Sequence, residues 1–396
     1  MRPIALICAR AVVLAGPTVL AFFSGGFFDE PRVWAGLVAW ALVAIAALVA
    51  PRPFPRVASA RLVLAGLALL LAWTALSTRW APLKGPAYDD VQRLGLYLGA
   101  LVAAVALLRG RRTARAAEAA TAIGALVVVG YGLSERLLPG LIEFARSPSA
   151  GGRLDQPLTY WNAMGLVAAL GLVLCARLAG DPERHDRARV LAAAAAAPLG
   201  LGLYISFSRG GLLAYAAGLA VLIAAAPSWP TLRGVALTLQ AAALGAVVSA
   251  PFDGVTALAG DLGQRKAEGT TVLVVLALIV LGAAAVQARL CGGERELRLR
   301  MEPLGLPRRT PLIAVACVLA GLVLFVAVAA RDRGPAPTAA GAARLGSVQS
   351  NRYAYWRVAG RSWADHPLRG VGAGGFRVEW LRERPFREPA QDAHSL

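Results

Sequence analysis

The sequence contains few histidines and cysteines, and this shortage argues against a metal or disulfide framework. The 396 residues include three histidines and four cysteines. Neither set clusters in the sequence or shows the spacing of metal ligands or paired half-cystines. The sequence therefore predicts no structural metal site. The histidines are His185, His366 and His394, and the cysteines are Cys8, Cys175, Cys291 and Cys317.

Charged residues are also scarce, at 16% of the chain, whereas hydrophobic residues make up 57%. Apolar runs of roughly 20 residues recur, long enough to cross a hydrocarbon core of about 30 Å. Backbone amides cannot stay unpaired in lipid, so these runs must be helices. The sequence predicts an all-α polytopic membrane protein with eleven transmembrane helices. They are Ala5–Phe23, Val33–Ala50, Leu62–Leu76, Val91–Leu108, Ala119–Leu138, Tyr160–Leu178, Val190–Phe207, Leu212–Ala226, Val235–Ala250, Thr270–Val286 and Leu312–Ala330.

The formal net charge is +18, and most of the basic residues are arginines. In a soluble protein this charge would indicate a nucleic-acid partner. Here the arginines cluster in alternate loops, which the positive-inside rule makes cytoplasmic, so we expect no nucleic acid. We therefore predict a multi-pass protein of the cell (plasma or inner) membrane, and the alternation of the arginine clusters predicts a cytoplasmic amino terminus. The clusters begin at Arg52, Arg109, Arg184 and Arg295.

Two domains are predicted, a membrane domain over residues 1–330 and an extracytoplasmic loop over residues 331–396. The Pro- and Ala-rich stretch Gly334–Ala343 is typical of a flexible linker. A helix is expected over Val348–Ala364, ending before Pro367 because proline disfavours helix in the preceding residue. Its apolar side is predicted to carry Tyr355, Val358, Ala359 and Trp363.

Arginines near the outer surface are the first functional candidates. Arg209, in Ser208-Arg209-Gly210, either anchors a helix end at the membrane interface or binds a ligand. Arg352 has the fork geometry that suits a pyrophosphate. Arg357 and Arg361 are expected on the solvated face of the same helix.

Three further segments carry polar side chains or tight turns. The loop Arg153–Asn162 brings an arginine, two aromatic residues and an asparagine to the start of a span, where Asn162 needs a partner and could line a polar cavity. Gly370–Gly375 matches G-x-G-x-x-G but lacks the βαβ context of a nucleotide site, leaving a tight turn whose amides could approach a ligand. His394 and His366 compete as a general base.

Taken in order, several of these segments resemble the O-antigen ligase superfamily, which includes O-antigen ligases, Wzy-type polymerases and pilin oligosaccharyltransferases. The resemblance covers roughly residues 60–396. Its pieces are Tyr160-Trp161-Asn162, Ser208-Arg209-Gly210, Arg352-Tyr353-Ala354-Tyr355-Trp356, Asp365–Phe376 and Ala393-His394-Ser395-Leu396.

The resemblance implies a GT-C-like membrane glycosyltransferase that works in cell-surface polysaccharide assembly. A glycan on a polyprenyl diphosphate would be the donor, and a glycan, lipid or protein hydroxyl the acceptor. Arg209 and Arg352 would hold the diphosphate and His394 would deprotonate the acceptor, with inversion and without a metal or other cofactor. The residues that would contact substrate are Arg153, Asn162, Tyr355, Gly372 and Gly374.

In the family the histidine motif continues into further spans, so the chain is expected to be truncated, with uncertain activity of its own. Two alternatives stay open. A transporter or flippase for lipid-linked sugar would place charges deep within spans, and no acidic residue lies centrally in a predicted span. A non-catalytic assembly partner is the other alternative.

Overall fold

The computed structural model describes residues 2–50, 55, 57–145, 150–297, 352–388 and 390–393. Within these ranges the regular secondary structure is helical, and the bridge between Pro139 and Ile142 is isolated. The predicted span Leu312–Ala330, the linker Gly334–Ala343 and His394 lie outside the described residues.

Ten of the predicted spans coincide with helices. Nine helices in the described ranges are long and apolar enough to cross a bilayer, and the tenth, α8, has 17 residues. These helices make the chain a multi-pass membrane protein. Their bounds are α1 Arg2–Ala21, α2 Asp29–Val49, α3 Ala58–Ser77, α4 Lys84–Leu107, α5 Arg111–Leu137, α6 Trp161–Ala179, α7 Asp186–Ile205, α8 Arg209–Ala225, α9 Trp229–Ser249 and α11 Leu262–Leu297.

Short elements complete the described chain. A 3₁₀ turn, η1, covers Ser24–Gly26 and a single helical turn, α10, covers Asp253–Thr256. After the segment that is not described come α14, Arg352–Asp365, and α15, Phe376–Glu383. The end of α14 at Asp365 confirms the stop predicted from Pro367.

Contacts divide the chain into two compact units, and the division falls inside α5. Unit 1 contains the described residues from 2 to 117 and from 352 onward, and unit 2 those from 118 to 297. By their contacts, the carboxyl-terminal helices α14 and α15 belong to the same unit as α1–α4. The predicted boundary between a membrane domain and an extracytoplasmic loop at residue 330 lies outside the described residues and stays a prediction.

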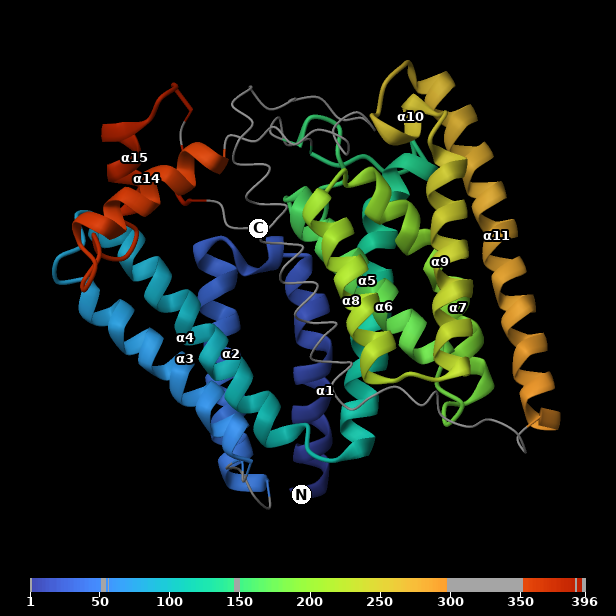
Figure 1. Cartoon of the computed structure of the whole chain (residues 1–396), viewed down its shortest axis with the longest axis horizontal. Helices are drawn as coiled ribbons and strands as arrows, with labels where there is room; N and C mark the ends of the chain where they lie inside the picture. Colours follow the sequence, from blue (N-terminus) through green and yellow to red (C-terminus); the bar gives the residue numbers. More distant parts are fainter. Residues whose placement is uncertain are drawn as a thin grey trace. The chain divides into compact units, whose positions relative to one another are not determined.

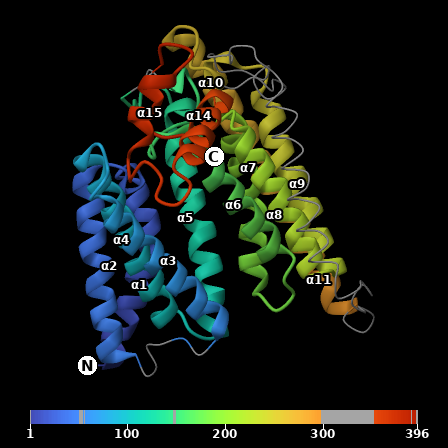
Figure 2. The same ribbon diagram turned by 60° about the vertical axis from the view of Figure 1, so that its left-hand side comes forward.

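In unit 1, α1–α4 run side by side (Figures 1 and 2). The Trp40 indole N–H donates to the Gly95 carbonyl at 3.1 Å, and the Arg10 guanidinium donates to the Leu107 carbonyl at 2.9 Å. These bonds fasten α2 and α1 to α4 around small and aliphatic side chains. That core contains Ala9, Leu42, Ala46, Ala103, Ala106 and Leu107.

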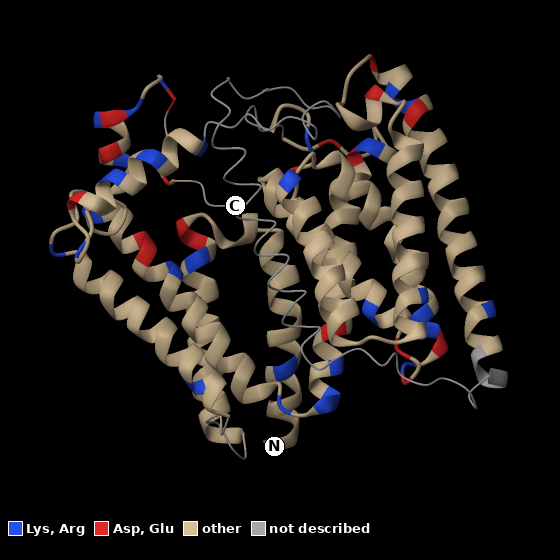
Figure 3. Ribbon diagram, viewed as in Figure 1, with Lys and Arg blue, Asp and Glu red and all other residues tan. Residues whose placement is uncertain are grey.

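In unit 2, α7 is the central helix, and most of its residues are buried. Small residues allow its neighbours to approach closely, as a Cβ at Gly200 would lie 2.3 Å from the Cα of Ala242 on α9. Lipid tails are as apolar as the side chains of these helices, so the hydrophobic effect does not drive the helices together. Close packing stabilises their association instead. Figure 3 shows that charged residues lie mainly toward the ends of the helices, while the helix centres are almost uncharged.

Candidate functional site

The polar end of unit 2, where α6 and α8 begin, gathers several residues that the sequence analysis selected. We call it the α6–α8 junction and define it by Arg153, Tyr160, Trp161, Asn162, Ser208 and Arg209.

Asn162 links the two helices of the junction. Its amide nitrogen donates to the Tyr160 hydroxyl at 2.8 Å, and its amide oxygen accepts from the Ser208 hydroxyl at 3.0 Å. The predicted partner of Asn162 is therefore supplied by the protein itself. An amide has two N–H donors and two lone pairs, so these bonds leave one donor and one lone pair of Asn162 for another partner.

Ser208 also begins α8. Its hydroxyl oxygen accepts from the Gly211 amide at 3.1 Å, which is the N-cap arrangement expected of serine. Arg209 is the first residue of α8 and is half-buried. Because a helix amino terminus carries partial positive charge, a cation here is disfavoured and an anion is favoured.

Arg153 is the second cationic residue of the junction and is only 4% exposed. Its guanidinium carbon lies 3.6 Å from the centroid of the Trp161 ring, and its Nε donates to the Ala150 carbonyl at 2.5 Å. A ring face and a carbonyl hold a guanidinium by cation–π attraction and hydrogen bonding. Trp161 therefore has a partner within the preceding loop.

Glycines make the junction possible. A Cβ at Gly165 of α6 would lie 2.6 Å from the Ser208 Cβ, and one at Gly211 would lie 2.9 Å from the Gly165 carbonyl carbon. Only residues without a side chain fit at this distance. The close approach fixes Ser208 and Arg209 against the start of α6.

Arg136, which the sequence analysis missed, supports the loop that carries Arg153. It is 2% exposed and donates to the carbonyls of Val255 at 2.7 Å, Thr256 at 3.1 Å and Gly152 at 2.7 Å. The only sequence signal was an arginine at the predicted outer end of a span, against the positive-inside trend, which resembles any interfacial anchor.

Two buried carboxylates lie close to Arg136. Burial raises the pKa of Asp155, which is 9% exposed, and the neighbouring Glu135 raises this pKa further. The Asp155 and Gln156 amides and the Arg136 guanidinium act in the opposite direction. Burial is the largest of these effects, so Asp155 holds its proton more tightly than an exposed aspartate.

The remaining predicted site residues lie in unit 1. Arg352 is the half-buried first residue of α14. Tyr355 is 4% exposed and contacts the Trp380 ring edge-on, with ring centroids 4.7 Å apart. Tyr355 is therefore a core residue of the α14–α15 segment, and burial together with Glu388 raises the pKa of its phenol.

The predicted apolar side of α14 is partly wrong. Tyr355 and Val358 are buried as expected, but the next buried position is Ser362, while Trp363 is 66% exposed. Arg357 and Arg361 are exposed, which agrees with the predicted solvated face, and Arg361 lies 3.5 Å from a Glu383 carboxylate oxygen.

Gly372 and Gly374, which were predicted to contact substrate, lie close to other parts of unit 1. Both have positive φ, at 85° and 65°, and added Cβ atoms would lie 2.6 Å from the Ala81 Cα and 2.7 Å from the Pro86 Cβ. Between them, the Ala373 amide donates to the Ser77 hydroxyl at 3.1 Å. The turn is thus docked on the ends of α3 and α4.

No protein-family model matches this chain, and neither the curated proteins nor the solved structures searched contain a match. Among the described residues, no group of three or more His, Cys, Asp or Glu side chains could hold a metal ion.

Proposed function

We propose that this chain is a membrane glycosyltransferase that moves a glycan from a polyprenyl diphosphate to an acceptor hydroxyl at the outer face of the membrane, in the manner of the O-antigen ligase superfamily it resembles. The observation that carries the proposal is the α6–α8 junction. Two arginines, Arg153 and Arg209, lie at the beginnings of two apolar helices that are linked by Asn162 and Ser208.

This arrangement suits an anion attached to a lipid. The apolar helices provide a surface for the polyprenyl chain, and the guanidinium groups and helix amino termini provide positive potential at their ends. A guanidinium offers paired donors that match phosphate oxygens. The junction therefore fits a diphosphate better than a neutral head group.

The reaction would be a displacement at the anomeric carbon. The acceptor oxygen forms the new bond to this carbon while the bond to the diphosphate oxygen breaks, and the diphosphate leaves with the electron pair. Arginines at the diphosphate stabilise the charge that develops on it. The acceptor proton passes to a general base, for which the sequence predicts His394; the roles of His394 and Arg352 stay predictions.

The test is release of polyprenyl diphosphate by the full chain reconstituted in lipid nanodiscs with a lipid-linked glycan and an acceptor. Arg209→Ala should lower the rate by about 100-fold or more, the usual effect of removing a group that stabilises developing charge. The matched control is Arg233→Ala, because Arg233 is an exposed residue of α9 near the opposite end of the unit. Control and wild-type rates should agree.

Two results would contradict the proposal. One is release of the diphosphate that is unchanged in Arg209→Ala, which would remove the arginine from the chemistry. The other is movement of the intact lipid-linked glycan across the bilayer without release, which would make the chain a flippase.

A further inference from the structure

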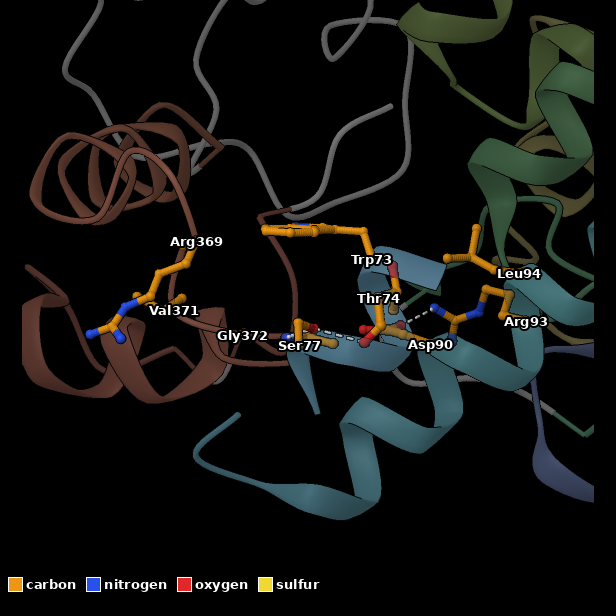
Figure 4. A pocket seen from close by; sticks show the side chains of 11 residues that line it. Trp73, Thr74, Ser77, Asp90, Arg93, Leu94, Arg369, Val371 and Gly372 are labelled. Carbon is orange, nitrogen blue, oxygen red and sulfur yellow. Dashed lines mark hydrogen bonds and ion pairs between the residues drawn. The ribbon is translucent and has the colours of Figure 1, made fainter. Parts of the chain in front are cut away.

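A pocket of about 400 Å³ lies within unit 1, between the ends of α3 and α4 and the glycine-rich turn before α15 (Figure 4). This volume falls in the range of small-ligand sites, about 300–1,000 Å³. Residues 369–373 form one wall. The other walls are Trp73, Thr74 and Ser77 of α3 and Asp90, Arg93 and Leu94 of α4.

Trp73 gives the pocket an aromatic surface that is held in place. Its side chain is 46% exposed and meets the Trp80 ring edge-on, with centroids 5.9 Å apart. The Trp80 indole N–H donates to the Arg369 carbonyl at 3.2 Å. The electron-rich face of such a ring attracts polarised C–H groups, which one face of a sugar ring presents.

The polar groups of the pocket are balanced in charge. An Arg93 nitrogen lies 3.0 Å from an Asp90 oxygen, and the two side chains are 32% and 31% exposed. Their remaining donors and acceptors can therefore reach a ligand. The Arg369 side chain points away from Trp73 and Asp90 in Figure 4, so it does not add positive charge beside the pair.

Balanced charge and an aromatic face favour a neutral polyhydroxylated ligand over an anion. A phosphate would have to compete with Asp90 for Arg93, whereas a sugar hydroxyl can donate to the carboxylate and accept from the guanidinium at once. The docked turn, held by the bond from the Ala373 amide to Ser77, closes one side of the pocket.

We propose that this pocket binds one neutral sugar residue, stacked on Trp73 and hydrogen-bonded to the Asp90–Arg93 pair. The choice of a neutral sugar rests on the pocket, while the expectation that the sugar belongs to a transferred glycan rests on the proposed function. The sugar could come from the lipid-linked donor or from a free acceptor glycan.

The test is calorimetric titration of the full chain in nanodiscs. The probes are neutral oligosaccharides of hexose and N-acetylhexosamine, the same glycans on polyprenyl diphosphate, and inorganic pyrophosphate. If binding of the free oligosaccharide depends on Trp73 as strongly as binding of the lipid-linked glycan does, the pocket is assigned to an acceptor glycan. Dependence on Trp73 only for the lipid-linked form assigns it to the donor.

Trp73→Ala should weaken binding of the glycan by about tenfold, equivalent to about 1.4 kcal/mol, and Trp73→Phe should restore part of it. The matched control is Trp34→Ala, which removes another exposed tryptophan, 62% exposed on α2 and outside the pocket lining. Asp90→Asn should weaken binding of the glycan and should allow pyrophosphate to bind, because the charge of Arg93 is then no longer balanced by a carboxylate.

The proposal is overturned if no neutral oligosaccharide and no lipid-linked glycan binds, or if Trp73→Ala and Trp34→Ala behave alike. It is also overturned if wild-type protein binds pyrophosphate and Arg93→Gln abolishes that binding. If the wild-type protein binds the glycan in a Trp73-dependent way but releases no polyprenyl diphosphate, the transferase proposal is contradicted. The sugar-pocket proposal then still holds.

Discussion

The two units hold their polar-end arginines with different kinds of partner. In unit 1, Arg32 lies 2.7 Å from Asp29 and 2.9 Å from Asp89, and Arg93 lies 3.0 Å from Asp90. In unit 2, backbone carbonyls hold Arg136, and a carbonyl and an aromatic ring hold Arg153. In the unit 1 pocket a carboxylate accompanies Arg93, whereas the α6–α8 junction combines the guanidinium groups of Arg153 and Arg209 with the amino terminus of α8. From this comparison we propose an anion for the junction and a neutral ligand for the pocket.

The largest effect is expected from Arg136→Met, because three backbone carbonyls would lose a charged donor in a buried place. We expect the free energy of unfolding to fall by about 3–5 kcal/mol, measured by denaturant titration in mixed micelles. The variant also releases the loop that carries Arg153, so diphosphate release should be lost.

A second arginine variant tests the carboxylate pairs of unit 1. Arg32→Met removes the partner of Asp29 and Asp89, which acid can protonate, so the cost of this variant in unfolding free energy should shrink as the pH falls. A cost that stays the same between neutral and acidic pH would contradict this pairing.

Gly165→Ala should be the next most damaging change. Its Cβ would meet Ser208 at 2.6 Å, and overpacking of this kind costs about 1–3 kcal/mol. Gly130→Ala on α5 is the matched control, since nothing lies within 4 Å of its added Cβ. Thermal unfolding followed by tryptophan fluorescence should separate the two; similar melting temperatures would contradict the close approach of α6 and α8.

Ser208→Ala and Ser228→Ala compare two serine N-caps of the same unit. Ser208 accepts from the Gly211 amide and Ser228 from the Thr231 amide, so each change should cost about 1 kcal/mol of unfolding free energy. Ser208 also donates to Asn162. Only Ser208→Ala should therefore slow diphosphate release, and equal slowing by both variants would argue against a special role for the junction.

The smallest effect concerns Asp155. Because burial raises the pKa of Asp155 in the folded protein, folding favours the protonated carboxyl relative to the unfolded chain. The contribution of this carboxyl to stability is therefore present at low pH and is lost as the pH rises through the raised pKa. Asp155→Asn imitates the protonated carboxyl. The melting temperature of Asp155→Asn should be higher than that of wild type at neutral pH, and the two should converge as the pH falls. A difference in melting temperature that grows in acid would contradict the raised pKa.

The sequence predicted the helices well and their contacts poorly. Long apolar runs leave the backbone no alternative to helix in lipid, so ten predicted spans appear as helices. The stacking of Arg153 on Trp161 joins residues eight positions apart across a loop with a cis Gln156–Pro157 bond, and no periodicity reports such a contact. The close approach of Gly372 to Ala81 could not be predicted, because a glycine required by close packing and one required by a ligand look alike in sequence.

The measurement that tests the account most directly is binding of polyprenyl diphosphate to the full chain in nanodiscs, compared for two arginine variants. Arg209→Gln removes a charge from the α6–α8 junction of unit 2, and Arg93→Gln removes one from the charge-balanced pocket of unit 1. The account predicts that Arg209→Gln weakens binding by about tenfold or more and that Arg93→Gln leaves it unchanged. Equal loss in both variants, or loss only in Arg93→Gln, would contradict it.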